Sequence, residues 1–288
     1  MKHTLPATAE QFLQQTIEKL GVYPCDFSEN FAMIQRASAT SRPYKAAGVL
    51  VLLFHPQTKG TEKDGGEFYF RLIERSRRVS QAGDLACPGG IFQATLDTCL
   101  GKLIKSGLLP LLRNSAGALA REREGDTYDL IAFFLANAAR EAWEEIGLNP
   151  FRIRFLGPLP AYRLHLSERT IFPLVCFIPG DHRLRPNYEV ERIVDIPVRA
   201  FFDAGNYGRI IPEIPPGLDL PESESRAKPC LIYSDEQSRE NILWGATFSI
   251  VTRFLKIVLA YDIPAWQNKR SVIKTLNRDY LAGNNNSI

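Results

Sequence analysis

The chain has 288 residues, of which 45% are hydrophobic and 23% are charged, a composition typical of a soluble globular protein. Its net charge of +3 is too small to favour a nucleic-acid or anionic-membrane partner, and its five scattered cysteines, without a CxxC pair, favour neither a zinc site nor a disulfide framework. No apolar run reaches the ~18 residues of a membrane span and no signal-like segment follows Met1, so we expect a cytoplasmic protein.

The first 43 residues are interpreted as an N-terminal extension that packs on the main domain. Residues 8–20 form an amphipathic pattern in which Phe12 and Ile17 fall near helical spacing. Pro24 and the stretch 28–43 then interrupt this regularity. We therefore expect one helix and a break in the regular pattern before the domain begins.

A strand pair is expected to open the domain. Residues 46–55, AAGVLVLLFH, are continuously apolar and predict a buried strand. Residues 57–67 are polar and glycine-rich, which is typical of a hairpin loop. The alternating residues 67–74 then predict the partner strand.

The next segment, residues 75–90, is predicted to be a loop with a short strand, and it is strongly basic. It carries Arg75, Arg77 and Arg78 close together. Arginines in such a cluster can bind phosphate through charge-assisted hydrogen bonds. The alternative is that the three side chains are simply solvated, and the sequence leaves both interpretations open.

Two apolar helical patterns follow, at residues 100–109 and 130–135, separated by a small and charged stretch at 115–126. The second pattern either continues directly into the next helix or forms an antiparallel pair with the first. Both patterns are too apolar to remain in water. They must therefore be buried against the domain or against a second subunit.

A helix with clustered carboxylates is predicted at residues 137–147. Glu141, Glu144 and Glu145 lie at i, i+3 and i+4, so their side chains share one face. A divalent cation such as Mg²⁺ would relieve their mutual repulsion, because it prefers carboxylate oxygens. The alternative is a solvated acidic face in which Arg140 pairs with Glu144.

The last third of the chain predicts further strands, a surface loop and one long helix. The helix at residues 247–259 has an apolar stripe, with Thr247 as a candidate cap. The other expected segments are strands at 153–159, 170–178 and 230–233, a proline-rich loop at 212–228, and a tail at 266–288.

The carboxylate helix and the loop before it resemble the box of the Nudix hydrolase family. That box reads G, five residues, E, seven residues, then REUxEExGU, where U is apolar. Its second half matches completely, at Arg140, Glu141, Glu144, Glu145, Gly147 and Leu148. Its first half begins at Gly90, but the glutamate is expected at Leu96 and Asp97 stands one place later. Residues 98–139 replace the seven-residue spacer, so an insertion splits the box.

Further positions resemble the branch of this family that hydrolyses coenzyme A. The matches are Leu72-Ile73, Arg75-Ser76, Gly83, Pro88-Gly89-Gly90 and the Trp-Gly-x-Thr start at 244–247. Two positions depart: Val79 stands where the branch has Arg, and Cys87 stands where it has Phe. The resemblance covers about residues 45–260, apart from the insertion.

The resemblance implies an α/β/α sandwich with a mixed sheet, formed by one domain at residues 44–265 that carries the helical insertion 98–137. It also implies Mg²⁺ or Mn²⁺ as cofactor. Arg140 would position Glu141, and Glu189 would act from a facing loop as ligand or base. The metal ligands would be Glu141, Glu144, Glu145 and the Gly89 carbonyl, with Asp97 in place of the displaced glutamate.

The implied activity is hydrolysis of a phosphoanhydride in a nucleoside diphosphate derivative, with coenzyme A or an acyl derivative as the leading substrate. ADP-ribose or NADH is the alternative substrate, and a non-catalytic nucleotide-binding regulator is the alternative function. The insertion would narrow access to the site, form a homodimer contact, or be an inert decoration. Small nucleotides are thus the expected partners.

Overall fold

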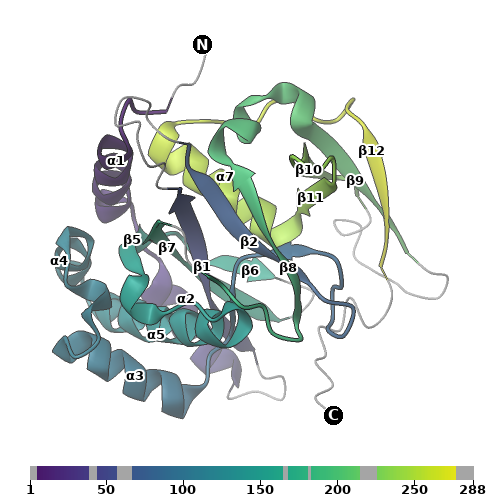
Figure 1. The fold of residues 1–288 in the computed structure, drawn as a ribbon. Helices are drawn as coiled ribbons and strands as arrows, with labels where there is room; N and C mark the ends of the chain where they lie inside the picture. The colour runs from purple at the N-terminus through teal and green to yellow at the C-terminus, as the bar shows by residue number, and fades with distance from the viewer. Residues whose placement is uncertain are drawn as a thin grey trace.

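The computed structural model describes residues 5–38, 44–56, 67–164, 168–180, 183–214 and 226–276. Within these ranges the chain forms a mixed α/β fold with two β-sheets (Figure 1). The expected hairpin loop at 57–66, most of the proline-rich loop and the end of the tail lie outside the described residues. Within the described residues, no helix is long and apolar enough to span a bilayer.

The main sheet is mixed, as the sequence predicts. Strand β1 (Lys45–His55) pairs in parallel with β7 (Arg169–Pro179) along its whole length and antiparallel with β2 (Tyr69–Arg75). The strand order is β3-β2-β1-β7-β5, with β4 on β1, β6 on β7 and β8 on β2. The other strands are β3 (Leu85–Ala86), β4 (Gly89–Ile91), β5 (Arg154–Pro158), β6 (Tyr162–Leu164) and β8 (Val190–Pro197).

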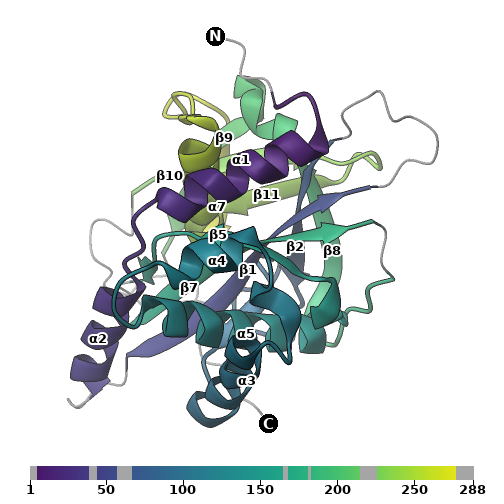
Figure 2. The same ribbon diagram turned by 90° about the vertical axis from the view of Figure 1, so that its left-hand side faces the viewer.

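Helices cover both faces of this sheet, which makes the expected α/β/α sandwich (Figure 2). Along β1, Leu50 and Leu52 face the core under α5 (Thr127–Ile146), while Val51 and Leu53 face the core under α7 (Gly245–Leu259). Burial on both faces explains why this strand reads as a continuous apolar run. The long strand and the carboxylate helix are therefore fixed against each other by one core.

The N-terminal segment contributes two helices rather than one. Helix α1 (Ala9–Val22) has the predicted amphipathic pattern, and Thr8 and Gln11 form a capping box at its start. Helix α2 (Phe27–Ser38) lies where the sequence predicts a break in the regular pattern. Phe27 is fully buried, with its ring edge-on to Phe172 at a centroid distance of 5.0 Å. Phe27, Phe31 and Ile34 stand at i, i+4 and i+7 and face the core, so the expected break at 28–43 is wrong for residues 28–38, where the helical period is present in the sequence.

The insertion is mostly helical, and its second pattern continues directly into the carboxylate helix. Helix α5 runs without a break from the insertion into the carboxylate segment, and α3 (Ala94–Ser106) packs against it. A 3₁₀ helix (Pro110–Leu112) and α4 (Ser115–Arg121) connect the two, and the charged residues 122–126 after α4 form a turn. Ile104, Leu111 and Leu130 are buried in the core of this same chain.

A second, four-stranded sheet was not predicted. Its order is β11-β10-β9-β12, formed by β9 (Tyr207–Glu213), β10 (Lys228–Ser234), β11 (Glu240–Trp244) and β12 (Ser271–Thr275). Strand β12 belongs to the segment expected to be a tail, yet it pairs in parallel with β9. Its residues alternate between exposed and half-buried, so the strand carries no strong apolar pattern. Three further 3₁₀ turns lie at Pro150–Arg152, Val198–Phe202 and Ala204–Asn206.

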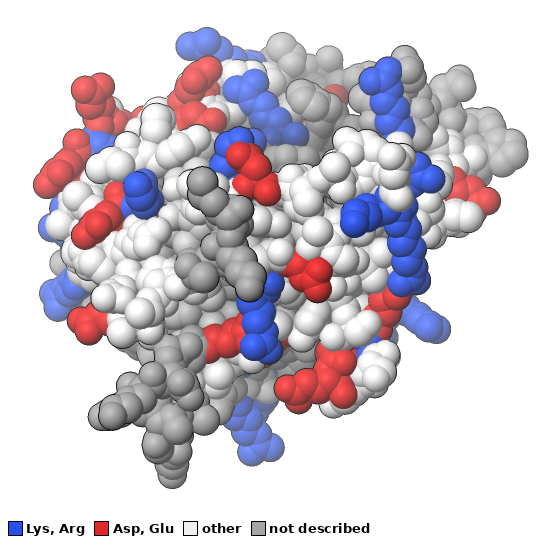
Figure 3. Space-filling model, turned by 90° about the horizontal axis from the view of Figure 1, so that it is seen from above, with Lys and Arg blue, Asp and Glu red and all other residues white. Residues whose placement is uncertain are grey.

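Charge on the outside of the molecule is mixed. In the view from above, acidic and basic side chains are interspersed and neither sign covers this face (Figure 3). This distribution is in line with the small net charge of the sequence. The carboxylates of α5 line one cavity, which is described below.

Candidate active site

The carboxylates of α5 converge with the loop before α3 around one cavity of about 510 Å³. Its walls include Gly89 and Gly90 from β4, the carboxylates of Glu141, Glu144 and Glu145, and Glu189 from the loop before β8. Residues from three distant parts of the sequence thus meet at the C-terminal end of α5. The spacing of the glutamates predicts their shared face, and their meeting with Gly89 and Glu189 is what the resemblance implies.

Two glycines permit this close approach. A Cβ atom on Gly89, whose φ is +147°, would lie 2.2 Å from the Gly48 carbonyl oxygen of β1. A Cβ atom on Gly90 would lie 2.5 Å from the carboxyl carbon of Glu141. Both separations are shorter than van der Waals contact, so any larger residue would push the loop away from β1 and from α5.

Arg140 connects the acidic groups of the site. Its guanidinium contacts Asp97 at 2.8 Å through Nε, Glu141 at 2.8 Å through Nη2, and Glu144 at 3.1 Å through Nη1. Burial by itself would lower the pKa of Arg140, but the hydrogen bond to Asp97 and the charge of Glu141 outweigh it and raise that pKa above its usual value. Arg140 therefore stays charged and holds Glu141 in place.

The Asp97 carboxylate pairs with Arg140 and does not line the cavity. Its side chain is fully buried, and its Oδ2 accepts hydrogen bonds from the Gln93 backbone N–H and the Asn137 amide. Leu96, where the box glutamate is expected, is 44% exposed instead. The carboxylate one position later is thus the one that faces Arg140. Its oxygens are occupied by protein donors, which argues against the predicted role of Asp97 as a metal ligand.

Asn137 is a site residue that the sequence did not single out. It is fully buried, its Oδ1 accepts from the Gly48 N–H at 2.8 Å, and its Nδ2 donates to Asp97 at 3.0 Å and to the Ile91 carbonyl at 3.2 Å. One side chain therefore ties α5 to β1, to β4 and to α3. The sequence feature that could have indicated its role is an amide within the run Ala136 to Ala139, on the apolar face of a helix.

The surroundings of Glu145 and Glu141 disfavour the ionised form of both carboxylates. Burial raises the pKa of Glu145 to about 8, although the Gly89 N–H at 3.0 Å partly counteracts it, and the nearby charge of Glu141 raises it further. Burial also raises the pKa of Glu141, against the opposing effect of Arg140. A bound cation would stabilise the ionised form of both groups.

The donor set fits a hard divalent cation, because Glu141, Glu144 and Glu145 supply only carboxylate oxygens. Among the described residues, however, no three acidic, histidine or cysteine side chains are already arranged as a metal-binding group. Arg140 and the Gly89 N–H hold the carboxylates in this arrangement. Glu145 uses only its Oε2 for the Gly89 N–H, so its Oε1 would be available to a metal.

Glu189 lies on the opposite wall of the cavity. Its backbone is fixed by two contacts, since its N–H donates to the Asn187 side chain and its carbonyl accepts from the Ser76 N–H, both at 2.8 Å. Its negative charge is one of the influences that raise the pKa of Glu145. The side chain thus acts on the carboxylate cluster from a different element, as expected for a facing loop.

The three predicted arginines separate into two groups. Arg75 lines the cavity and donates through Nε to the Ser80 carbonyl at 2.8 Å. Arg77 and Arg78 are exposed on the turn and are not part of the cavity wall. Arg77 and Arg78 are therefore solvated, which is the second of the two interpretations that the sequence leaves open.

Arg169 is a second cavity cation, and the sequence did not single it out. It opens β7, its Nε is buried without a hydrogen-bond partner, and burial together with the charge of Arg75 lowers its pKa. Within the described ranges, neither Arg75 nor Arg169 makes an ion pair with a carboxylate. Two adjacent arginines on one cavity wall form a suitable place for an anion.

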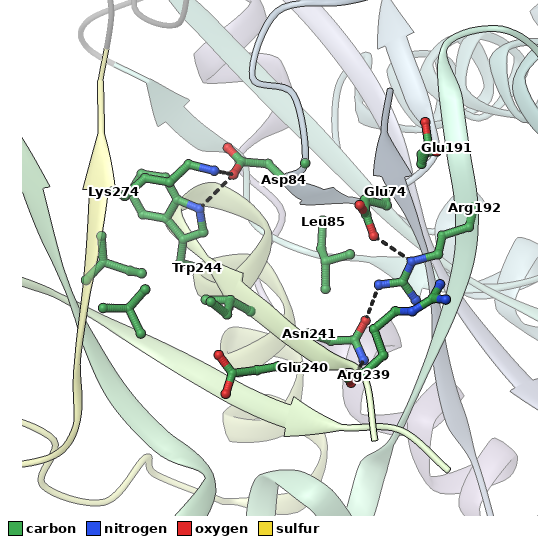
Figure 4. Close-up of a pocket in the computed structure, with 14 residues that line it drawn as sticks. Glu74, Asp84, Leu85, Glu191, Arg192, Arg239, Glu240, Asn241, Trp244 and Lys274 are labelled. Atoms are coloured by element: carbon green, nitrogen blue, oxygen red, sulfur yellow. Dashed lines mark hydrogen bonds and ion pairs between the residues drawn. The ribbon is translucent and has the colours of Figure 1, made fainter. Parts of the chain in front are cut away.

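A different cavity, of about 490 Å³, lies between the two sheets (Figure 4). Two of its ion pairs are Glu74 with Arg192 at 2.7 Å and Asp84 with Lys274 at 2.8 Å. None of the α5 carboxylates lines this cavity. The cavity at the end of α5 therefore remains the candidate active site.

No family model matches the chain. Solved structures with partial similarity include a Nudix hydrolase from M. smegmatis, RenU, at 14% identity over 54% of this chain and 71% of that chain, with a TM-score of 0.33. A C. elegans Ap4A hydrolase matches at 11% identity over 53% and 80% of the two chains, with a TM-score of 0.32. The Nudix domain of Shewanella oneidensis NrtR, complexed with ADP ribose, matches at 10% identity over 57% and 82%, with a TM-score of 0.31. Similarities of this size do not identify an activity.

Proposed function

We propose that this chain is a metal-dependent Nudix-type pyrophosphatase that hydrolyses a phosphoanhydride in a nucleoside diphosphate derivative. The observation that supports the proposal is a single cavity with two oppositely charged sides. Glu141, Glu144 and Glu145 form the negative side, and Arg75 and Arg169 form the positive side. A diphosphate with its divalent cations is complementary to both.

Each side chain has a defined task in this proposal. Glu141, Glu144 and Glu145, together with the Gly89 carbonyl, would hold Mg²⁺ or Mn²⁺, which neutralises phosphate charge when bound. Arg140 keeps Glu141 oriented, and Asp97 keeps Arg140 oriented through its buried ion pair. Glu189, on the facing wall, would complete the metal shell or accept a proton from the attacking water.

Arg75 and Arg169 would bind the substrate phosphates, because guanidinium groups form charge-assisted hydrogen bonds with phosphate oxygens. Substrate binding would then relieve the repulsion between the two arginines and provide a partner for the buried Nε of Arg169. Coenzyme A or an acyl derivative is the leading substrate, and ADP-ribose and NADH are the alternatives.

The test is product release from coenzyme A, ADP-ribose and NADH with Mg²⁺ or Mn²⁺ at fixed protein concentration. We expect phosphate-monoester products from at least one of these compounds, and no product when EDTA removes the metal. A non-catalytic nucleotide-binding regulator is the competing function. The absence of a ready-made metal group among the described residues favours it. Tight nucleotide binding without any product would support that function and refute the pyrophosphatase.

Changing Arg169 to Gln is expected to raise KM for the accepted substrate about 10- to 100-fold, since a charge-assisted hydrogen bond contributes roughly 1.5–3 kcal/mol. The kcat should change much less, because Arg169 would bind the substrate before and during the reaction alike. The fold should tolerate the change, which removes a repulsion with Arg75. Steady-state kinetics would measure both parameters.

The matched control is Arg78→Gln on the exposed turn, which should leave KM within about twofold, since surface substitutions rarely exceed ±0.5 kcal/mol. Equal KM values for the Arg169→Gln variant and the unaltered protein would show that Arg169 does not bind substrate. A large rise in the Arg78→Gln variant would instead move the phosphate site to the turn.

A further inference from the structure

The carboxylate cavity continues into a second compartment of about 220 Å³. The two spaces share six wall residues: Arg75, Gln81, Gly89, Gly90, Leu164 and Arg169. Both arginines thus stand at the junction between the spaces. A molecule whose phosphates contact them can extend from the carboxylates into this second compartment.

The compartment is mainly apolar. Twelve of its 21 wall residues are aliphatic, aromatic or cysteine side chains, and Gln81 and Thr247 are the uncharged polar ones. Apolar side chains come from the main sheet and from the first turn of α7, including Val49, Leu85, Cys87, Ile171, Ala246 and Ile250. A sugar or a second nucleotide would lose hydrogen bonds to water there, at a cost of about 1–3 kcal/mol for each unpaired group.

On the side of the second sheet the wall includes the charged side chain of Lys228, and the polar groups of Asp84 and Trp244 are bonded to each other. The indole N–H of Trp244 donates to Asp84 at 3.0 Å, and Lys274 of β12 pairs with the same carboxylate oxygen at 2.8 Å (Figure 4). Because the single polar atom of the indole is bonded to Asp84, Trp244 offers only apolar surface to the compartment. Asp84, Leu85 and Trp244 line both this compartment and the cavity between the sheets.

Cys87 contributes a small, uncharged surface. It is 6% exposed, and burial raises the pKa of its thiol to about 12. The side chain is therefore protonated at physiological pH and is not a nucleophile. It leaves open a volume that a larger side chain at this position would occupy.

We propose that this compartment binds an uncharged, apolar arm of the substrate, which is attached to the diphosphate held at Arg75 and Arg169. This inference rests on the proposed function and specifies its substrate class as diphosphate esters with an alkyl-like arm. The mainly apolar wall suits an alkyl chain better than a second nucleoside, whose polar groups would lose their hydrogen bonds to water.

The experiment compares three esters of ADP that share one nucleotide half: ethyl-ADP, hexyl-ADP and ADP-ribose. With Mg²⁺, kcat/KM is expected to be at least tenfold higher for hexyl-ADP than for ethyl-ADP, because each added methylene can bury apolar surface. ADP-ribose is expected to be no better than ethyl-ADP. Hydrolysis without dependence on chain length, or a preference for ADP-ribose, would overturn the inference while leaving the pyrophosphatase intact.

Two variants test whether the dependence of kcat/KM on chain length arises in this compartment. Cys87→Phe fills the compartment from the sheet side, and Ala246→Leu narrows it from the half-exposed first turn of α7, where the fold tolerates a larger side chain more easily. In each, kcat/KM for hexyl-ADP should fall at least tenfold more than for ethyl-ADP. The control Ala204→Leu adds the same bulk at an exposed position outside the compartment and should change neither value. Equal losses for both esters would refute the assignment.

Binding distinguishes this inference from the activity on which it rests. If no ester is hydrolysed with any metal, the proposed function fails. Calorimetric titration of hexyl-ADP and ethyl-ADP then still tests whether the compartment binds an apolar arm. At least tenfold tighter binding of hexyl-ADP, abolished by Ala246→Leu, would uphold this assignment. Equal affinities for the two esters would reject it.

Discussion

Changing Glu145 to Gln is expected to abolish metal-dependent turnover and, at the same time, to stabilise the metal-free fold. The neutral amide cannot offset the charge of the cations, so we expect a loss of at least about 100-fold in kcat, similar to the removal of a preorganised electrostatic group. The amide oxygen can still accept the hydrogen bond from the Gly89 N–H. The variant should therefore fold with the loop in place.

The stabilising effect follows from the direction of the pKa shift. The pKa of Glu145 rises from 4.5 to about 8 in the folded protein, so the folded state binds a proton that the unfolded state has already released. The metal-free protein therefore loses stability as pH increases from about 4.5 through about 8, where the penalty is complete. Glutamine removes this penalty, which is on the order of 5 kcal/mol for a shift of this size.

Thermal unfolding at pH 5 and pH 8.5, with and without Mg²⁺, would measure this effect. Without metal, the Glu145→Gln variant should have the higher Tm at pH 8.5 and nearly the same Tm at pH 5. Mg²⁺ should raise the Tm of the unaltered protein more than that of the variant, because binding to the folded state alone stabilises it. An unaltered Tm difference across this pH range would contradict the burial of an ionised Glu145.

Glu144→Gln is the matched control, because it makes the same chemical change one helix position away. The Glu144 side chain is 52% exposed and contacts Arg140 alone among the described residues. We expect the same loss of turnover but no gain in stability. A near-normal rate at low Mg²⁺ in either variant would remove that residue from the metal site.

Changing Asp97 to Ala is expected to destabilise the protein by about 3–5 kcal/mol, the usual effect of removing one partner from a buried ion pair. Asp97 is fully buried and the Arg140 side chain is 8% exposed, so solvent cannot replace the lost carboxylate. The Gln93 N–H and the Asn137 amide would lose their acceptor as well. Denaturant unfolding would measure the change.

The catalytic consequence separates a positioning role from a purely structural one. Without Asp97, Arg140 retains only Glu141 and Glu144, and Glu141 loses its fixed orientation. We expect a lower kcat and a higher Mg²⁺ concentration for half-maximal rate, with KM for the substrate little changed. A loss of stability without any change in the Mg²⁺ dependence would reduce Asp97 to a structural residue.

A register test completes this prediction. The double variant Leu96→Asp, Asp97→Leu moves the carboxylate to the position expected from the family pattern. We expect no recovery of stability, because position 96 is exposed and faces away from Arg140. Asp97→Asn, which keeps the hydrogen-bonding shape but not the charge, should lie between the unaltered protein and Asp97→Ala. Full recovery in the double variant would show that the loop can shift its register.

Local patterns in the sequence determined the main elements of the fold and half of the site. Strands β1 and β7 are buried on both faces, so they read as continuous apolar runs, and α5 and α7 carry apolar stripes at helical spacing. The shared face of Glu141, Glu144 and Glu145 follows from the period of a helix alone. These properties depend on neighbours within a few residues, which is why they could be predicted.

The tertiary structure alone decided the remaining features. Strand β12 has a weak local pattern, and its pairing with the distant strand β9 holds it. Arg169 stands among polar residues at the start of β7, and Asn137 is a single amide in an apolar run, so their roles become apparent only when β7 and α5 meet the loop at Gly89. The choice of Asp97 over position 96 depends on which side of α3 faces Arg140. A helical period defines a face, whereas long-range packing determines what that face contacts.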